Sequence, residues 1–510
     1  MSMISRLAVL LCMGLALALM ACGEAPPAPT EVPTAMPTPT IVVSPDEAEW
    51  DDRAVFRAGL IGSEQAILDS LPGATVYHID LQIPEDFQML EGHQELLYTN
   101  REEVALEEIY FRLFANTSGG KAVVSGVQVD RQDVEGEYAF EQSAFRVPLP
   151  APLEPGDEAV IAMDFEVEVP REMGGNYGLF GYFDDVLVLD EFYPAIPVYD
   201  DEGWNVEVPP PSGDLTYFDA SFYLVQVTAP SGLVVVVSGT ELAREVDGDL
   251  QTLIFAAGPS RDFYIAASER YTLISEQVGE TTVNSYAFPE RRDHAELALQ
   301  YAVDALQSFN ERFGTYPYVE YDMVSSPMQA MGIEYPGIVG IGLSLYDPGA
   351  EISGLPSQVL LQGAVAHEVG HQWFYSVVAN DQVDESWLDE ALVQYITGLY
   401  YLDVGGERAL EGWRGSWYDR WQRVEMAEVP VGLPSGDYSD QREYGSIVYG
   451  RGPIFMDTLA KEMGQATFDA FLRDYYQSHK WGIGTGEAFK ALAEEHCQCD
   501  LTSLFEAWVY

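Results

Sequence analysis

The chain has 510 residues, which is too long for a single ordinary domain and predicts two or three. Apolar residues make up 47% of the sequence, enough to fill the cores of such domains. The 82 acidic residues outnumber the 25 basic ones and give a formal net charge of −57. This charge argues against nucleic acid as a partner and indicates a strongly solvated surface.

The first 21 residues are typical of a signal peptide. Arg6 is the one charged side chain among them, and it precedes an apolar run from Leu7 to Ala21 that is short for a membrane span. The run ends in Leu-Met-Ala-Cys, which resembles a bacterial lipobox with Cys22 as the lipidated residue. An ordinary signal peptide followed by a chance cysteine is the alternative. The lipobox predicts an extracytoplasmic protein that is anchored to a bacterial cell membrane through Cys22.

Residues 22–48 are predicted to be a proline-rich tether. Seven prolines lie between Gly23 and Pro45, among small and polar residues that cannot form a core. A stiff spacer of this kind would hold a lipid-anchored domain away from the membrane surface.

Residues 49–270 are predicted to form an N-terminal β-sandwich domain. Apolar and polar residues alternate in several runs that turn signals separate. The clearest runs cover residues 77–83, 109–114, 160–169 and 222–228. The glycine-rich run 174–181 lacks the Lys-Ser/Thr pair of a phosphate-binding loop and is interpreted as a connecting loop.

Residues 271–510 are predicted to form an α/β domain with a helical tail. Together with the N-terminal β-sandwich, this domain gives the whole chain a predicted α+β multidomain fold. Residues 291–313 have the pattern of one long amphipathic helix, and residues 321–345 have that of strands. Residues 405–510 are helical with few breaks. Tryptophans recur every four residues in this tail, which indicates a packed helix face rather than a ligand platform: Trp413, Trp417 and Trp421.

The run Ala-His-Glu-Val-Gly-His that ends at His371 points to a metal site. His367 and His371 are four residues apart, so on a helix both imidazoles can reach one Zn²⁺. Glu368 borders the open coordination position, where a general base for water belongs. Eighteen residues separate His371 from Glu390, which lies on a second predicted helix and can supply the third ligand. Two histidines, a glutamate and a water are typical of a catalytic zinc site rather than a structural one. Two unrelated histidines on a helix surface are the alternative.

Three segments resemble the M1 family of zinc aminopeptidases, in the gluzincin group. The first is HEVGHQWF together with the Glu of WLDEALVQY. Met331-Gly332-Ile333-Glu334-Tyr335 resembles the GxMEN exopeptidase motif of the family, and Tyr449-Gly450-Arg451-Gly452 resembles the segment of its transition-state tyrosine. The resemblance covers about residues 75–510. It implies a saddle-like β-sandwich packed on a thermolysin-like catalytic domain with one zinc ion per chain.

The resemblance also implies roles for single residues. Glu368 would be the general base, and Tyr449 would donate a hydrogen bond to the oxyanion of the transition state. Glu334 would bind the free amine of the substrate from an edge strand away from the ligand helices. Gly332 and Ile333 would line the groove beside it. Tyr335 replaces the usual Asn of this motif and Ile333 replaces the Met, which leaves strict exopeptidase action open.

The function that these observations predict is zinc-dependent removal of N-terminal residues from peptides with a free N-terminus. A gluzincin endopeptidase or another peptidase-like hydrolase is the first alternative. A catalytically inactive surface-binding lipoprotein is the second, although such a protein has no need of a general base.

Other residues near the motifs carry weaker expectations. Gln394 follows Glu390 by one helical turn and is expected to orient a metal ligand. Asp389 is expected to point off the ligand face, where it would be solvated or would cap the helix. Cys497 and Cys499 are interpreted as free or oxidised structural thiols.

Overall fold

The computed structural model describes residues 44–45, 48–50, 52–210, 213–352 and 354–510. The predicted signal peptide, Cys22 and most of the predicted tether lie outside these residues. Within the described part of the chain, none of the helices combines the length and the apolar character that a bilayer span requires.

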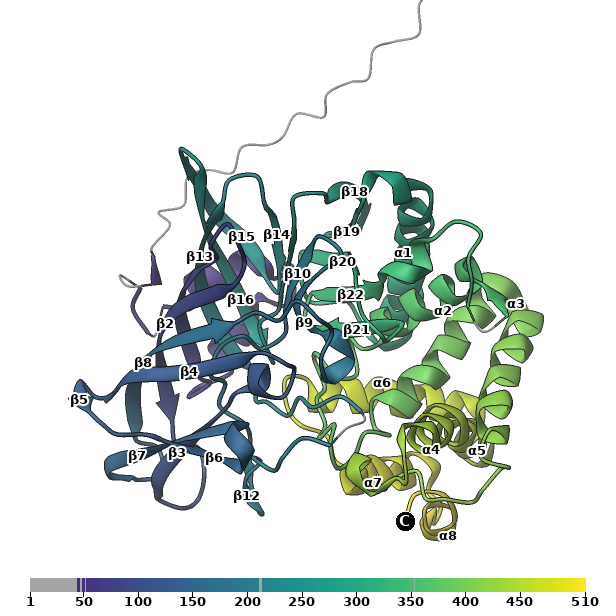
Figure 1. Ribbon diagram of the computed structural model, residues 1–510. Helices are drawn as coiled ribbons and strands as arrows, with labels where there is room; N and C mark the ends of the chain where they lie inside the picture. The colour runs from purple at the N-terminus through teal and green to yellow at the C-terminus, as the bar shows by residue number, and fades with distance from the viewer. Residues whose placement is uncertain (1–43, 46–47, 51, 211–212, 353) are drawn as a thin grey trace, which may run out of the picture. The chain divides into compact units, whose positions relative to one another are not determined.

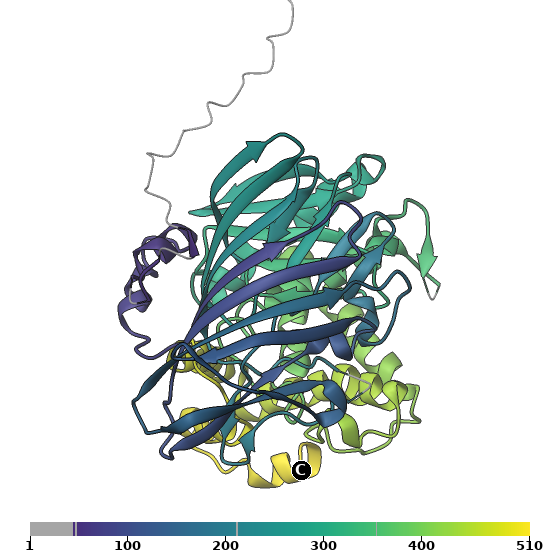
Figure 2. The same cartoon turned by 60° about the vertical axis from the view of Figure 1, so that its left-hand side comes forward.

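The first half of the described chain is dominated by β-sheet, as predicted. Two 3₁₀ turns, Ala54–Gly59 and Gln65–Asp69, precede an eight-stranded sheet with the order β15-β16-β13-β1-β2-β8-β4-β5 (Figures 1 and 2). Its neighbouring strands are antiparallel except for the parallel pair β1 and β13. The strands are β1 (Val76–Gln82), β2 (Met89–Thr99), β4 (Lys121–Val129), β5 (Gln132–Asp133), β8 (Glu158–Glu168), β13 (Ser221–Pro230), β15 (Thr240–Asp247) and β16 (Leu250–Ser260).

Smaller sheets complete this β-rich region. One has the order β3-β7-β6, another has the order β14-β17-β10-β9, and β11 pairs with β12. Alternation of buried and exposed residues is clear along β8, which explains why its period-two sequence predicted a strand. The strands are β3 (Leu106–Arg112), β6 (Glu137–Ala139), β7 (Ala144–Leu153), β9 (Phe180–Phe183), β10 (Val186–Leu189), β11 (Tyr199–Asp200), β12 (Gly203–Trp204), β14 (Val234–Val237) and β17 (Ile265–Ser268).

The glycine-rich run 174–181 is only partly a loop. Asn176–Gly178 form a 3₁₀ turn, and Phe180 already begins β9. Positive φ angles at Asn176, Tyr177 and Gly178 turn the chain sharply before this strand. The predicted loop is therefore shorter than the glycine content indicates.

The second half of the chain opens with a five-stranded mixed sheet of order β18-β19-β20-β22-β21. Strand β21 lies at its edge and is antiparallel to β22. Helices α1 (Arg292–Phe313) and α2 (Ser357–Gly370) pack against each other and against strands of this sheet (Figure 1). The strands are β18 (Thr272–Val278), β19 (Thr281–Ala287), β20 (Glu320–Ser326), β21 (Gly332–Tyr335) and β22 (Ile338–Gly342).

Helices form the rest of the chain. The long helix α3 contains a break in helical geometry at Gly406, where φ is 68°. Trp417 is buried on α3 and the neighbouring Trp413 and Trp421 pack against the same core, so the predicted tryptophan stripe is a packed face. Cys497 and Cys499 are joined by a disulfide bond. The helices are α3 (Glu390–Gln422), α4 (Gln441–Ser446), α5 (Gly452–Met463), α6 (Gln465–His479), α7 (Gly486–Cys497) and α8 (Thr502–Trp508), with a π-helical turn at Ile447–Arg451.

The β-rich region and the second half of the chain are packed together within one compact unit, residues 42–510. The predicted boundary at residues 270 and 271 falls between β17 and β18 and stays a prediction. Arg261 joins the two regions, because its buried guanidinium donates to the carbonyl oxygens of Val377 (3.0 Å) and Gly482 (2.7 Å).

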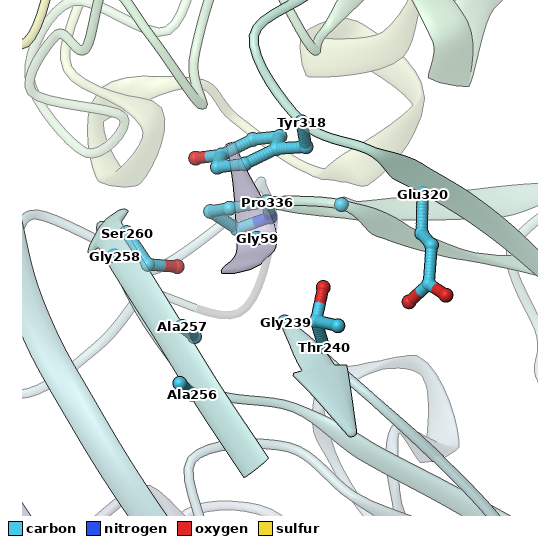
Figure 3. Close-up of a pocket in the computed structure, with 11 residues that line it drawn as sticks. Gly59, Gly239, Thr240, Ala256, Ala257, Gly258, Ser260, Tyr318, Glu320 and Pro336 are labelled. Carbon is cyan, nitrogen blue, oxygen red and sulfur yellow. The ribbon is translucent and has the colours of Figure 1, made fainter. Parts of the chain in front are cut away.

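A small cavity also lies between the two regions. Figure 3 shows it lined by residues of β15 and β16 on one side and by Tyr318 and Glu320 on the other. Its volume of about 10 Å³ suits a single water molecule rather than a substrate.

Candidate active site

The end of helix α2 brings two histidines together. His367 lies in its last turn and His371 caps it, with their Nε2 atoms 3.1 Å apart. Glu390 Oε2 lies 3.0 Å from His367 Nε2 and 3.6 Å from His371 Nε2. All three side chains are buried, and their ligand atoms lie within 4.8 Å of one another. The structure thus assembles the three predicted ligands at one point.

Asp389 positions Glu390. Glu390 is the first residue of α3, and Asp389 Oδ1 accepts a hydrogen bond from its backbone N–H at 2.9 Å, which makes Asp389 the N-cap. Asp389 is fully buried and also accepts hydrogen bonds from Gln382 (2.8 Å) and Asn380 (3.2 Å). The expectation of a cap is correct, whereas the expectation of a solvated side chain is wrong, because the loop between α2 and α3 covers it.

The histidine rings are oriented as metal ligands require. His371 Nδ1 lies 3.2 Å from the carbonyl oxygen of Phe374, so Nδ1 carries the proton and Nε2 faces Glu390. Gln394 lies beside His367 Nδ1 at 3.4 Å, as expected. Gln394 Oε1 has no partner among the described residues, and rotating its amide by 180° would let this oxygen accept from Nδ1–H. Burial lowers the pKa of His367 to about 4, which keeps it in the neutral, metal-binding form.

The charge of this cluster also fits a metal ion. Burial alone would raise the pKa of Glu390, but hydrogen bonds from His367 and His371 hold it well below its usual value. Glu334, Glu368 and Asp214 lie around the same point, and burial raises the pKa of each. A divalent cation would supply the positive charge that so many buried carboxyl groups need. Two imidazoles and one carboxylate are a donor set that suits zinc.

Glu368 lies between the two histidines on α2, as the spacing predicts. It is 4% exposed, and its Oε2 atom has no partner among the residues that the structure describes. Gly332 lies directly against it, because a Cβ at this position would be 2.2 Å from Glu368 Oε1. The predicted groove residue Gly332 therefore leaves room for Glu368.

Glu334 lies on the edge strand β21, but it is not far from the ligand helices. Its Oε1 atom lies 3.7 Å from His371 Nδ1 and accepts a hydrogen bond from Gln382 Nε2 at 3.2 Å. The expectation that Glu334 is remote from the metal ligands is wrong, because β21 runs alongside α2. Burial raises the pKa of Glu334 to about 8.

Tyr449 also reaches the cluster. Its hydroxyl lies on the π-helical turn before α5 and donates to Glu390 Oε1 at 2.5 Å. The structure thus places the predicted tyrosine beside the predicted metal ligands, although Tyr449 and Glu390 are 59 residues apart in the chain.

A cavity of about 20 Å³ lies next to Glu334. It has room for one water-sized group. Ile333 and Tyr335 line it together with side chains of the β-rich region, and no lysine or arginine is among its lining residues. Tyr335, which departs from the family motif, donates through its hydroxyl to Asp190 Oδ1 at 2.7 Å. The carboxyl groups around the cavity belong to Asp190, Glu191, Asp214 and Glu334.

Four further polar residues at this site could not be recognised from the sequence: Asp190, Glu191, Asp214 and Gln382. Asp190 and Glu191 follow strand β10, and Asp214 lies in the long connection before β13. Gln382 lies in the spacer between the two ligand helices. None of them belongs to a motif with a recognisable spacing, so only the folded chain reveals that they meet.

The chain is similar in sequence to known peptidases. Residues 297–508 match the model of the peptidase family M1 domain. The chain is 25% identical to Aminopeptidase 2 of Candida albicans over 309 residues, which cover 56% of this chain and 32% of that protein. It is also 25% identical to Aminopeptidase M1-B of Oryza sativa subsp. japonica over 383 residues, or 69% of this chain and 41% of that protein. The chain thus spans less than half the length of these relatives.

Solved structures share the fold. The M1 zinc metallopeptidase of Deinococcus radiodurans superimposes with a TM-score of 0.62 at 18% identity, covering 85% of this chain and 92% of that one. A mutant of that protein bound to a Tyr-Ser-Ala substrate matches equally well, over 86% of this chain and 94% of that one. The predicted order of a β-rich region followed by a thermolysin-like region with a helical tail is confirmed.

Proposed function

We propose that the chain is a member of peptidase family M1 and a zinc aminopeptidase, which removes residues from the N-terminus of peptides; the family-model match over residues 297–508 and the similarity to M1 aminopeptidases support this. One observation carries this proposal. The buried carboxylate of Glu334 lies 3.7 Å from a metal-site histidine and beside a water-sized cavity that acidic groups surround. A substrate ammonium group matches that cavity in both size and charge.

His367, His371 and Glu390 would hold the zinc ion. When bound, zinc supplies Lewis-acid chemistry that polarises a carbonyl group and lowers the pKa of water toward about 7. The rest of the reaction depends on the side chains of this chain. Glu368 takes the proton of the attacking water through Oε2, which has no hydrogen-bond partner in the described part of the chain, and passes it to the leaving amine. Because Glu368 is buried, water in bulk solution does not compete for this proton.

Tyr449 stabilises the charge that develops during the reaction. Its hydroxyl is a hydrogen-bond donor at the edge of the cluster, where it now donates to Glu390. The carbonyl oxygen of the substrate becomes an oxyanion as water adds. The Tyr449 hydroxyl can then donate its hydrogen bond to this oxyanion instead of to Glu390. Such a contact forms fully only in the transition state, so it raises kcat rather than substrate affinity.

Glu334 and the edge strand would select the end of a chain. Among the described strands β21 pairs only with β22, so backbone groups on its other edge can pair with an extended peptide, apart from the Tyr335 carbonyl, which accepts from Gln372 Nε2 at 3.0 Å. The ammonium group of the first residue would bind Glu334 and fill the cavity, which places the first peptide bond at the metal site. A longer chain cannot continue past this point, which favours an aminopeptidase over an endopeptidase.

A panel of fluorogenic aminoacyl amides tests this function. The zinc-loaded protein should hydrolyse amides with a free amine and should leave their N-acetylated forms intact. Equal hydrolysis of both forms would favour the endopeptidase alternative. A fully zinc-loaded protein with no turnover on either form would favour the inactive binding protein.

We further propose that the protein is a lipoprotein, exported by a signal peptide and anchored to a bacterial membrane through Cys22. The Leu-Met-Ala-Cys run and the proline-rich segment after it support this proposal. Two or three acyl chains on one cysteine would anchor a protein firmly, whereas a single chain binds only weakly. Mass spectrometry of the N-terminal peptide is the test, and an unmodified Cys22 in the soluble fraction would contradict it.

A further inference from the structure

Gln382 links the proposed ammonium site to the metal site. It lies in the loop between α2 and α3 and is 1% exposed. Its Nε2 atom donates to Glu334 Oε1 at 3.2 Å and to Asp389 Oδ2 at 2.8 Å. Asp389 in turn caps the helix that begins with Glu390. One side-chain amide therefore contacts both the carboxylate that would bind the substrate and the cap that positions a metal ligand.

These two contacts fix the orientation of the amide. Asp389 accepts hydrogen bonds from the backbone N–H of Glu390 and from Asn380, so it also acts as an acceptor toward Gln382, whose Nε2 atom lies 2.8 Å from Asp389 Oδ2. The NH₂ group of Gln382 can donate to this oxygen and to Glu334 Oε1, whereas rotating the amide by 180° would place its oxygen against two carboxyl oxygens. The identity of Nε2 and Oε1 thus follows from the neighbours of the side chain.

The other end of the Gln382 amide is its oxygen, Oε1. Gln382 Oε1 is buried and makes no hydrogen bond to any residue that the structure describes. Gln382 lines the same cavity as Glu334, Asp190, Glu191 and Asp214. A buried acceptor of this kind is costly unless a donor reaches it. Two further lining residues donate elsewhere: the Thr216 hydroxyl donates to Glu191, and the Asn176 amide donates to Asp190.

We propose that Gln382 is a substrate-binding residue whose Oε1 atom accepts a hydrogen bond from the N-terminal ammonium group, while its Nε2 atom holds Glu334 in place. This inference rests on the proposed aminopeptidase function and extends it. An ammonium group has three N–H donors and no acceptor. Glu334 can take one or two of them, and Gln382 Oε1 can take another. A neutral acylated amine has only one N–H and a bulky substituent, so it cannot replace the ammonium group here.

Two hydroxamate inhibitors that differ only in the amine give a direct test. Leucine hydroxamate and its des-amino analogue both bind the metal through the hydroxamate, so the ratio of their inhibition constants reports the ammonium site alone. In the wild-type zinc protein, leucine hydroxamate should bind more tightly. Gln382→Met should raise its inhibition constant about 10-fold or more and change that of the des-amino compound by less than about twofold. Equal weakening of both compounds, or no change in either, would overturn the inference.

Two further variants sharpen the result. Gln382→Glu keeps an oxygen at the position of Oε1 but loses the N–H donors to Glu334 and Asp389, so the ratio between the two compounds should fall less than in Gln382→Met. A Glu variant whose ratio is as low as that of the Met variant would count against a contact through this oxygen. Asn380→Leu is the matched control, because Asn380 donates to the same Asp389 but does not line the cavity. Asn380→Leu should shift both inhibition constants by the same factor. A selective loss of leucine hydroxamate binding in this variant would show that the selectivity depends on the Asp389 cap rather than on Gln382 Oε1.

The experiment separates the inference from the function on which it rests. A wild-type protein that binds both hydroxamates equally would contradict the proposed ammonium site itself, and the inference would fall with it. A wild-type protein that prefers leucine hydroxamate, with a Gln382→Met variant that keeps this preference, would overturn only the role of Gln382.

Discussion

Gly332 and Glu368 are in such close contact that a methyl group at position 332 would overlap the carboxylate of Glu368. The two residues come from different elements, the edge strand β21 and helix α2. The contact lets strand and helix approach closely, and it holds Glu368 beside the metal ligands. Position 332 therefore needs a glycine because a side chain there would displace Glu368, and not because the strand conformation demands one.

Gly332→Ala should lower kcat strongly while zinc remains bound. The added Cβ would lie 2.2 Å from Glu368 Oε1, so the carboxylate must move, and a displacement of this size typically costs about 10²-fold in rate. Gly340→Ala on the neighbouring strand β22 is the control, because its Cβ would first meet the mobile end of Met328. Steady-state kinetics and zinc content on both variants check the prediction. A Gly332→Ala enzyme with wild-type kcat would show that Glu368 does not need its present position.

Glu368→Gln should keep zinc and lose nearly all turnover. Glu368 is not among the three converging ligands, so the metal affinity should change little. Loss of a general base typically costs about 10² to 10⁴-fold in kcat. Zinc stoichiometry and kcat should be measured on the same preparation. A variant as active as the wild type would exclude Glu368 as the base.

Glu334→Gln should lower kcat/KM for substrates with a free amine by about 10²-fold, since a charge-assisted hydrogen bond to the ammonium group is lost. The amide has nearly the same shape as the carboxylate, so the packing against β21 should persist. Because Glu334 lies 3.7 Å from His371 Nδ1, zinc content must be measured as a control. A zinc-loaded variant with unchanged kcat/KM would make Glu334 a structural residue.

Asp262→Asn should make the free energy of unfolding less sensitive to pH. Burial raises the pKa of Asp262 from 3.8 to about 8, despite a hydrogen bond from Tyr375, and its Oδ1 atom has no partner among the described residues. A carboxyl group with a raised folded-state pKa stabilises the fold fully below its unfolded pKa. That contribution is lost as pH rises from about 4 to about 8.

The variant lacks this titration, so its stability relative to the wild type should increase over the same pH window. The gain should be at most about 6 kcal/mol, since one pKa unit corresponds to about 1.4 kcal/mol. Urea unfolding of both proteins at several pH values between 4 and 9, a range that brackets about 3.8 and about 8, measures it. A stability difference that stays constant across this range would contradict a buried neutral Asp262.

The metal ligands could be predicted from the sequence because their geometry is local. Four residues on a helix bring His367 and His371 onto one face, and the start of the next helix brings Glu390 to them. The period-two runs predicted strands for the same local reason. By contrast, the burial of Asp389 depends on how the loop between α2 and α3 folds over it, which no short pattern records.

Local sequence patterns did not predict the contacts between segments that are distant in the chain. Glu334 was recognised on its motif, yet its distance from His371 depends on how β21 packs along α2. Gln382 and Asp214 belong to no motif, and they meet Glu334 only because two loops far apart in the chain converge. Tyr335 departs from the motif, and its hydroxyl finds a partner, Asp190, in the β-rich region.

The cavity beside Glu334 has walls from both halves of the chain. Asp190, Glu191 and Asp214 precede residue 270, whereas Glu334 and Gln382 follow it. The second half of the chain, expressed without the β-rich region, would still carry every proposed metal ligand and the proposed base, but it would lack most of the acidic wall of this cavity. Under the proposed function, exopeptidase selectivity would therefore be a property of the interface, and swapping β-rich regions between homologous peptidases would be expected to transfer selectivity without altering the bond-breaking chemistry.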